Sequence, residues 1–174
     1  MIQEQLAFLP GSLPDYQPFP PAKERTAWQA LPLRAKQRFL QAGETALQTS
    51  LAPLPLTLWL DFTRTGRRTA WETAYFSRRA RLCALVCAEC VEHKGRFLDA
   101  IADTVWTLCE ESAWQLPAHN SYVRDTPQLP LPDTTRPIVD LFAAETGALL
   151  ALTRYLLPDE LDTAAPGITA RMER

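Results

Sequence analysis

The sequence predicts an all-α fold built from antiparallel helical hairpins. Apolar residues recur at helical spacing along residues 68–93 and again along residues 96–111, a pattern typical of amphipathic helices. Gly95 separates the two stretches, so the connection is short and the two helices are expected to run antiparallel. The chain also has 15 Pro but only 6 Gly, a balance that suits proline-rich connectors between helices.

The composition is that of a globular protein. With 174 residues, the chain is long enough for one domain and short for two. Hydrophobic residues make up 47% of it and charged residues 22%, which excludes wholesale disorder. The net charge of −2 gives no general attraction to nucleic acids or membranes. No apolar run of about 18 residues is present, so no transmembrane helix is predicted.

The compartment is inferred from the N-terminus and the cysteines. The first residues have no basic stretch followed by an apolar core, so we expect no signal peptide. Together with four Cys, this predicts a cytoplasmic protein with reduced thiols. A periplasmic location would follow if the true start of the protein lay upstream.

The first elements are separated by prolines. Residues 1–22 predict an irregular arm, because five of them are proline, and residues 23–174 form the domain. Pro32 stands at the start of a first helix that covers residues 33–50. Residues 56–62 alternate between apolar and other side chains, which favours a short strand or an extended lead-in.

The second half of the chain follows the predicted hairpin. A polar, proline-rich loop covers residues 121–137, and a further helix covers residues 138–157. Pro158 begins a turn, and Pro166 marks the first position of a last helix. Because no stop signal follows that helix, we expect either a polypeptide that continues beyond Arg174 or a truncated piece.

Three cysteines form a spacing that needs an explanation. Cys83, Cys87 and Cys90 are arranged as C-x3-C-x2-C, which resembles the cluster-binding motif of radical SAM enzymes. In those enzymes the cysteines lie in a loop, where three thiolates converge on iron. Here the three share one face of a predicted helix with apolar residues between them. We therefore interpret them as core residues and expect no metal cluster.

A basic stretch precedes and enters the first helix of the hairpin. Its six arginines are Arg64, Arg67, Arg68, Arg78, Arg79 and Arg81. One interpretation is a solvated basic face. Another is a polyanion site, because guanidinium groups bind carboxylates and sulfates through paired hydrogen bonds. Nucleic acid is a third interpretation, although the stretch matches no known reader motif.

Two acids end the second helix of the hairpin. Glu110 and Glu111 lie where the helix dipole disfavours negative charge, so a cationic partner is expected to hold them. The candidates for that partner are Arg64, Arg67 and His119. Because adjacent helical residues point about 100° apart, at most one of the two acids is expected to face a site.

The two histidines differ in their surroundings. His119 lies beside Asn120 in a loop directly after Pro117, and loops on rigid scaffolds often carry function. The alternative is that His119 and Asn120 cap this loop through hydrogen bonds to the backbone. His93 lies near a helix C-terminus, so we expect it at the surface or paired with the helix dipole.

Three segments carry a resemblance to a known family. They are YFSRRARL at residues 75–82, WTLCEESAWQLPAHN at residues 106–120 and DLFAAETGALLALTRYLL at residues 140–157. With them, the chain resembles the N-terminal region of heparinase II/III-like proteins, which are similar to polysaccharide lyases, from Phe19 to its end. The resemblance implies that the helices form part of an incomplete (α/α) toroid. It also implies a whole protein that carries the remaining toroid and a C-terminal β-sandwich.

The resemblance implies a reaction as well, the β-elimination of uronic-acid-containing polysaccharides by a carbon–oxygen lyase. This chemistry needs a group that neutralises the uronate carboxylate, a base for the C5 proton and an acid for the leaving oxygen. It needs no metal and no other cofactor. The implied partner is an acidic polysaccharide or oligosaccharide, rather than a nucleic acid or a membrane.

The resemblance points to candidate site residues. His119 and Asn120 match the PAHN of the family pattern and are the expected catalytic residues. The residues expected to bind substrate are Trp114, Glu111, Arg64, Arg67 and Tyr122. Trp114 would stack on a sugar ring or plug the toroid, and Tyr122 is the nearest tyrosine that could act as a base. The main alternative is a non-catalytic helical carbohydrate-binding or scaffold fragment. We expect the 174-residue chain alone to show little or no lyase activity.

Overall fold

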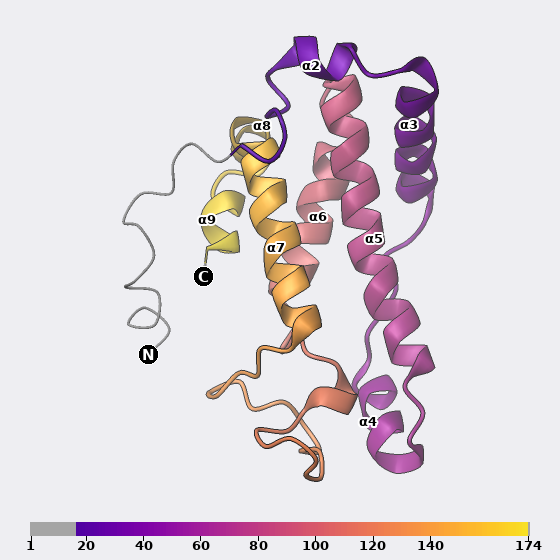
Figure 1. Cartoon of the computed structure of the whole chain (residues 1–174), viewed down its shortest axis with the longest axis vertical. Helices are drawn as coiled ribbons and strands as arrows, with labels where there is room; N and C mark the ends of the chain where they lie inside the picture. The colour runs from indigo at the N-terminus through magenta and orange to yellow at the C-terminus, as the bar shows by residue number, and fades with distance from the viewer. Residues whose placement is uncertain (1–16, 174) are drawn as a thin grey trace.

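The computed structural model describes residues 17–173, and within that range the chain is helical and contains no strand (Figure 1). The all-α prediction is therefore confirmed. The elements are α2 (Arg25–Gln29), α3 (Leu33–Gln48), α4 (Leu56–Thr65), α5 (Thr69–Glu92), α6 (Leu98–Cys109), the short 3-10 helix η1 (Pro117–His119), α7 (Leu141–Leu156), α8 (Pro158–Ala164) and α9 (Ile168–Met172).

The central element is the long helix α5, which contacts α3, α6 and α7 (Figure 1). The predicted antiparallel hairpin of α5 and α6 is confirmed, and its helical periodicity reflects burial. The fully or almost fully buried apolar side chains of the two helices include Leu82, Leu85, Val86, Ile101, Val105 and Leu108. With residues of α7, α8 and α9 they form the main core.

The turn between α5 and α6 is held by a buried acid. His93 and Gly95 both adopt positive φ angles, 55° and 78°, and a left-handed residue is a common way to end a helix. The Glu89 carboxylate, 1% exposed, accepts hydrogen bonds from the amides of Gly95 (2.7 Å) and Phe97 (3.2 Å). This residue therefore satisfies backbone donors at the start of α6 that have no helical partner.

Arginines cap the ends of two helices. Arg25 donates to the carbonyl oxygens of Cys90 (2.7 Å) and Val91 (2.8 Å), near the end of α5. Arg81 donates to the carbonyl oxygen of Ala46, in the last turn of α3, and to that of the following Thr49. Cations at helix C-termini satisfy unpaired carbonyls and interact favourably with the dipole.

The prediction of a strand or extended segment at residues 56–62 is wrong, because this segment lies in α4. Pro55 precedes the helix and Gly66, with φ of 75°, ends it. The apolar residues of the segment fit a helical pattern as well, in which Trp59 is buried. Leucine favours helices, and no partner strand lies within residues 17–173 to stabilise an extended form.

Three boundaries near the C-terminus also differ from the prediction. Helix α7 begins at Leu141 rather than at residue 138, because the Asp140 side chain accepts from the amide of Ala143 (2.7 Å) and so caps the helix. Pro158 opens helix α8 instead of a turn, as proline does at a first helical position. The last helix, α9, begins after Gly167 rather than at Pro166.

The end of the predicted N-terminal arm lies against the body of the domain, while residues 1–16 of that arm lie outside the described range. Ala22 is fully buried, and its amide donates to the carbonyl oxygen of Leu156 (2.9 Å). The Trp28 indole N–H donates to the carbonyl oxygens of Pro20 and Pro21 (both 3.1 Å).

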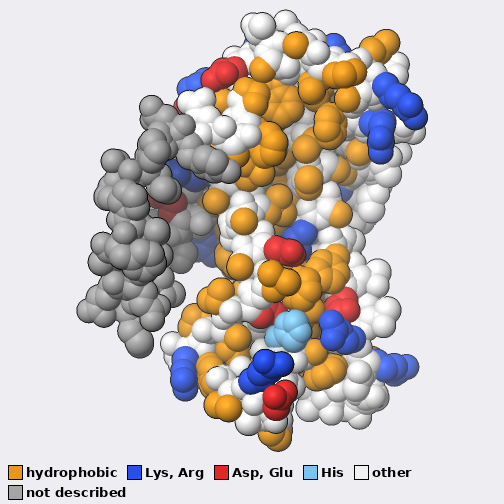
Figure 2. Space-filling model, in the orientation of Figure 1, with side chains coloured by type: hydrophobic (Ala, Val, Ile, Leu, Met, Phe, Trp, Pro, Cys, Tyr) orange, Lys and Arg blue, Asp and Glu red, His pale blue; other side chains and the backbone are white. Residues whose placement is uncertain are grey.

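Hydrophobic side chains are spread over both the upper and the lower part of the face seen in Figure 2. Charged side chains also lie in both parts, and a histidine lies in the lower part among acidic and basic side chains. Several large apolar side chains of the described residues are exposed, among them Leu33, Phe76, Val139 and Leu141.

The close packing of α3 on α5 generates a prediction. A Cβ atom at Gly43 would collide with the Cβ of Ala88 and lie 3.0 Å from a ring carbon of Phe97. We expect Gly43→Ala to lower the free energy of unfolding by about 1–3 kcal/mol, because such overpacking forces neighbouring groups apart. Urea denaturation followed by circular dichroism measures this change.

Gly147 in α7 provides the matched control, since a Cβ there would meet nothing within 4 Å. Gly147→Ala is expected to raise the free energy of unfolding by about 0.5–1 kcal/mol through helix propensity. Equal effects of the two substitutions would contradict the tight contact between α3 and α5.

Candidate functional site

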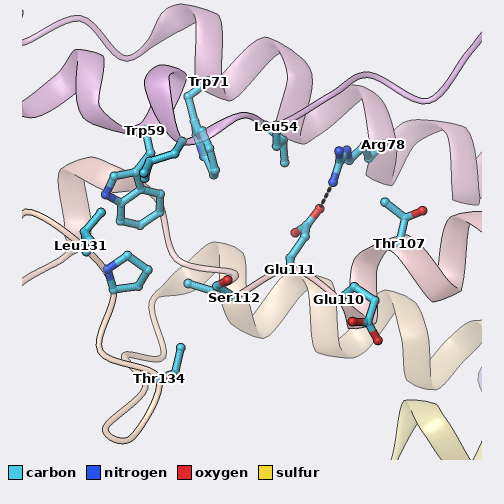
Figure 3. A pocket seen from close by; sticks show the side chains of 13 residues that line it. Leu54, Trp59, Trp71, Arg78, Thr107, Glu110, Glu111, Ser112, Leu131 and Thr134 are labelled. Atoms are coloured by element: carbon cyan, nitrogen blue, oxygen red, sulfur yellow. Dashed lines mark hydrogen bonds and ion pairs between the residues drawn. The ribbon is translucent and has the colours of Figure 1, made fainter.

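A cavity of about 470 Å³ opens between α4, α5, the segment that follows α6, and the loop before α7 (Figure 3). Its apolar lining includes Leu54, Trp59, Trp71 and Leu131. Its polar lining includes Thr107, Glu110, Glu111, Ser112 and Arg78. The volume lies in the range of small-molecule sites, which are mostly apolar with a few placed polar groups.

Two tryptophans form one wall of this cavity. The rings of Trp59 and Trp71 meet edge to face, with 5.1 Å between their centroids and 87° between their planes. The Trp59 indole N–H donates to the carbonyl oxygen of Pro130 (3.1 Å). Neither tryptophan was singled out from the sequence, because they meet only through the packing of α4 on α5.

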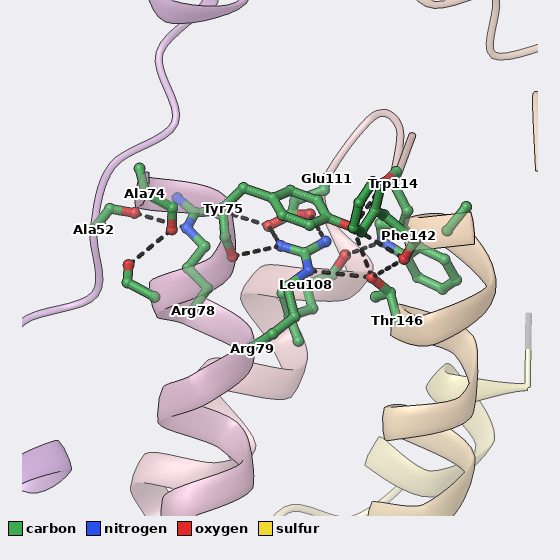
Figure 4. A network of polar contacts seen from close by, with 12 residues as sticks. Ala52, Ala74, Tyr75, Arg78, Arg79, Leu108, Glu111, Trp114, Phe142 and Thr146 are labelled. Atoms are coloured by element: carbon green, nitrogen blue, oxygen red, sulfur yellow. Dashed lines mark hydrogen bonds and ion pairs between the residues drawn. The ribbon is translucent and has the colours of Figure 1, made fainter. Parts of the chain in front are cut away.

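The opposite wall rests on a buried ion-pair cluster of Arg78, Arg79 and Glu111 (Figure 4). The three side chains are only 8–10% exposed. Glu111 accepts from both terminal nitrogens of Arg79 (3.0 and 2.5 Å) and from one of Arg78 (2.9 Å). This geometry includes the bidentate pairing for which arginine is suited.

Tyr75 links this cluster to α7. Its hydroxyl lies 2.7 Å from the carbonyl oxygen of Trp114, 3.1 Å from that of Phe142 and 2.9 Å from the Thr146 hydroxyl. The Arg79 guanidinium stacks over the Tyr75 ring, 3.3 Å from its centroid, and also donates to Thr146 (3.1 Å). Burial raises the pKa of Tyr75, so this hydroxyl stays protonated as a structural donor.

These contacts correct two expectations. Glu111 has the cationic partner that its position requires, but the partners are Arg78 and Arg79 rather than Arg64, Arg67 or His119. Glu110 instead pairs with Arg171 of α9. A solvated basic face is also wrong for Arg78 and Arg79, which are buried, whereas Arg64, Arg67 and Arg68 are exposed.

His119 is held by a carboxylate from the cap of α7. Its Nδ1 lies 2.6 Å from Oδ2 of Asp140, and its ring stacks on Phe142 with centroids 5.8 Å apart. The other carboxylate oxygen of Asp140 caps the helix through Ala143. Such a hydrogen bond to one ring nitrogen orients the imidazole and fixes where its proton sits. The His119 side chain remains 38% exposed.

Asn120 is fully buried, and its amide group is engaged at both ends. Its oxygen accepts from Gln115 (3.1 Å), and its nitrogen donates to the carbonyl oxygen of Leu129 (2.8 Å). The Leu129 amide in turn donates to the Asn120 carbonyl oxygen (2.7 Å). Asn120 therefore closes the loop between residues 120 and 129, as the capping interpretation expected.

The expected substrate-binding residues lie in different surroundings. Trp114 packs on the main core and donates to the carbonyl oxygen of Leu108 (2.9 Å). Tyr122 donates to Asp133 and to a backbone oxygen, and burial together with the Asp133 hydrogen bond raises its pKa, which opposes a role as base. Arg67 pairs with Asp61 (3.3 Å) at the surface. Arg64 is exposed on α4. Of this set, Glu111 lines the cavity.

Asp140 is the functional candidate that sequence reasoning missed. An acid directly before an apolar helical run is a helix N-cap signal, and Asp140 stands before LFAAETGALL. That signal would have placed the start of α7 correctly. It would not have predicted the contact with His119, which is 21 residues earlier in the chain.

The cysteines of α5 differ in exposure. Cys83 is exposed and borders a second hollow of about 260 Å³ between α5 and α7, while Cys90 is buried. A hydrogen bond from Cys87 lowers the pKa of Cys83 to about 6. Burial raises the pKa of Cys90 to about 12. Only the thiolate is a strong nucleophile, so Cys83 is the most reactive of these thiols at neutral pH.

The sequence matches no protein-family model, and no curated protein matches it significantly. Within residues 17–173, no three side chains of His, Cys, Asp or Glu converge as they would around a metal ion. In the same part of the chain, no helix combines the length and the apolar character needed to cross a bilayer.

The buried cluster leads to a stability prediction. Glu111→Gln removes the charge that compensates two buried guanidinium groups, so we expect a loss of about 3–5 kcal/mol in the free energy of unfolding. The neighbouring Glu110→Gln is the control, because its ion pair is largely exposed and should contribute about 0–1 kcal/mol. Thermal and urea denaturation compare the two variants. Similar losses would contradict a special role for the buried cluster.

The thiol environments lead to a second prediction. Iodoacetamide should modify Cys83 before Cys90 at pH 7, as read by peptide mass spectrometry. Because the pKa of Cys83 is lowered, its rate should rise as pH increases through about 6 and then level off. Cys87→Ala serves as the test of cause, since it removes the donor that supports the thiolate and should slow modification of Cys83. A Cys83 rate that still rises steeply above pH 8 would refute the lowered pKa.

Proposed function

We propose that this domain is the N-terminal helical part of an (α/α) toroid in a polysaccharide lyase that cleaves uronic-acid-containing polysaccharides by β-elimination. Three features support the proposal: the resemblance of its motifs to heparinase II/III-like proteins, the helical hairpin, and the environment of His119. The observation that carries it is the hydrogen bond from this exposed imidazole to Asp140 (2.6 Å). The apolar side chains exposed on the domain are where further toroid helices would pack.

The held imidazole suits the chemistry of the elimination. With Nδ1 bound to Asp140, Nε2 is the ring atom that can meet a substrate. A neutral Nε2 accepts a proton, whereas a protonated one donates a hydrogen bond to a uronate carboxylate or to the leaving oxygen. Asn120 supports this role by closing the loop that carries His119, because its own amide is engaged by Gln115 and Leu129.

The neighbourhood of His119 suits an acidic polymer. Helix α4 contacts η1, which contains His119, so the exposed Arg64 and Arg67 at the end of α4 belong to the same end of the domain (Figure 1). Lys and Arg side chains are visible in this lower part of Figure 2, together with acidic ones. A polyuronate lying across this end would gain favourable interactions with the guanidinium groups, and these would weaken with added salt.

His119→Ala tests the proposal in a protein that carries this domain within a complete toroid. We expect kcat on an acidic polysaccharide to fall by about 10²–10³, the cost of losing one donor to developing charge. The melting temperature should change little, because Asp140 keeps its hydrogen bonds from the amides of Ala143 and Leu116. Ultraviolet absorbance of the unsaturated uronate product measures turnover.

His93→Ala is the matched control. His93 ends α5, far along that helix from α4, and pairs with Glu160 (2.8 Å). This variant should keep its kcat. An unchanged kcat in His119→Ala together with a lowered melting temperature would assign His119 to the architecture and remove it from the site.

A second candidate function, carbohydrate binding without catalysis, is favoured by the cavity beside Trp59 and Trp71. Aromatic side chains beside hydrogen-bonding groups suit a ligand with both apolar and polar faces. Saturable binding of an oligosaccharide, with no unsaturated product from any acidic polysaccharide, would favour this function over the lyase.

A further inference from the structure

The cluster of Arg78, Arg79 and Glu111 does not balance its own charge. Two guanidinium groups share the single Glu111 carboxylate, with contacts of 2.9 Å from Arg78 and of 3.0 and 2.5 Å from Arg79. All three side chains are only 8–10% exposed. One positive charge is therefore left over in a wall that is largely shielded from water. Such a charge is costly unless an anion compensates it.

The other two acids that line the hollows beside the cluster do not balance this charge. Glu110, the second carboxylate of the large cavity, is paired with Arg171 of α9. Glu145 of α7 borders Arg79 from the smaller hollow on the other side, but it is exposed, so water and salt screen its charge. The wall thus keeps room for a further negative group.

Arg78 has an unused donor at this place. Its Nε donates to the carbonyl oxygen of Ala52 (2.7 Å), and its Nη1 donates to Glu111 (2.9 Å). Its Nη2 donates to no group within residues 17–173, and this nitrogen is not among the fully buried unpaired atoms of that range. Because Arg78 lines the large cavity, an anion in the cavity can accept a hydrogen bond from Nη2.

The rest of the cavity suits an aromatic body attached to that anion. Figure 3 shows Arg78 and Thr107 at one end of the space, and Trp59 and Leu131 at the other. The edge-to-face pair of Trp59 and Trp71 offers the ring surface against which a third aromatic ring packs well. A volume of about 470 Å³ is ample for one ring with a short side chain. Leu131 is 47% exposed, so the apolar end reaches the surface.

We propose that this cavity binds a small aromatic monocarboxylate, whose carboxylate accepts a hydrogen bond from Nη2 of Arg78 while its ring lies against Trp59 and Trp71. The ligand supplies the negative charge that the wall lacks, together with an apolar body that carries no sugar hydroxyls. The site is separate from His119, and the proposal does not rest on either carbohydrate function.

The first experiment uses the wild-type chain and changes the ligand. Calorimetric titration measures benzoate, phenylacetate and 3-phenylpropionate, each beside its uncharged amide. We expect at least one of the acids to bind, and its amide to have a Kd about tenfold higher or more, the effect of one charge-assisted hydrogen bond. Acetate, which has the charge without the ring, should bind far more weakly, because most of the buried apolar surface is then missing.

Arg78→Met tests the assigned donor. This change removes the surplus cation and leaves the bidentate pair of Arg79 with Glu111 in place, so the variant should keep its fold. The Kd of the best acid should rise about tenfold or more, whereas the Kd of its amide should stay the same. Arg38→Met is the matched control, because Arg38 is exposed on α3 and does not line the cavity. Its Kd values should equal those of the wild type.

A readout from the wild-type chain alone locates the ligand. Nuclear Overhauser effects should connect the ring protons of the bound acid to the rings of Trp59 or Trp71. None should reach Trp106, which is 55% exposed and lies outside the lining. This measurement and the comparison of acid with amide decide the proposal even if Arg78→Met fails to fold.

Four results would overturn the proposal. They are the absence of binding by every aromatic acid of the panel, equal binding of each acid and its amide, Overhauser effects to residues outside the cavity, and tighter binding of galacturonate than of any aromatic acid. The last result would assign the cavity to a carbohydrate instead. Failure of the lyase proposal has a different signature, since His119→Ala would then leave turnover unchanged. Binding of the aromatic acid should be the same in His119→Ala as in the wild type.

Discussion

The fold of the site depends on the buried pairing of Arg79 with Glu111. Every nitrogen of the Arg79 guanidinium donates to a described group: Nε to Thr146, Nη1 to Glu111 and the Tyr75 carbonyl oxygen, and Nη2 to Glu111. A buried charge is tolerated only when its hydrogen bonds are satisfied in this way. Because these partners belong to α5, α7 and the segment after α6, their relative positions are fixed together.

The segment that contains Glu111 lines the cavity and then leads to His119. Glu111 and Arg78 form one wall of the cavity, and five residues later Leu116 is fully buried against Tyr75 and the two tryptophans. The next residues form η1, which ends at His119. The cavity and the held imidazole therefore both depend on one segment, residues 110–120, and a shift of Glu111 would disturb both.

The sequence predicted best the helices whose buried residues recur at regular helical spacing. The buried rows of α5 and α6 follow helical spacing, so both helices and their hairpin could be derived. The prediction of a strand or extended segment at residues 56–62 was wrong, because the apolar spacing of these residues suits a strand as well as a helix. The need of Glu111 for a cation was also predictable from the dipole, but its partners 32 and 33 residues away were not. Only packing of α5 against the end of α6 selects Arg78 and Arg79.

The hydrogen bonds between Asn120 and Leu129 have a consequence for how such a protein can change over generations. They join the two ends of the loop between residues 120 and 129. Residues 122–127 of this loop are exposed. Changing the length of a loop with fixed ends adds little to its entropic cost. Insertions and deletions at its tip are thus expected to cost little stability. The exposed loop that follows His119 can therefore change in length during evolution while the helices keep their arrangement.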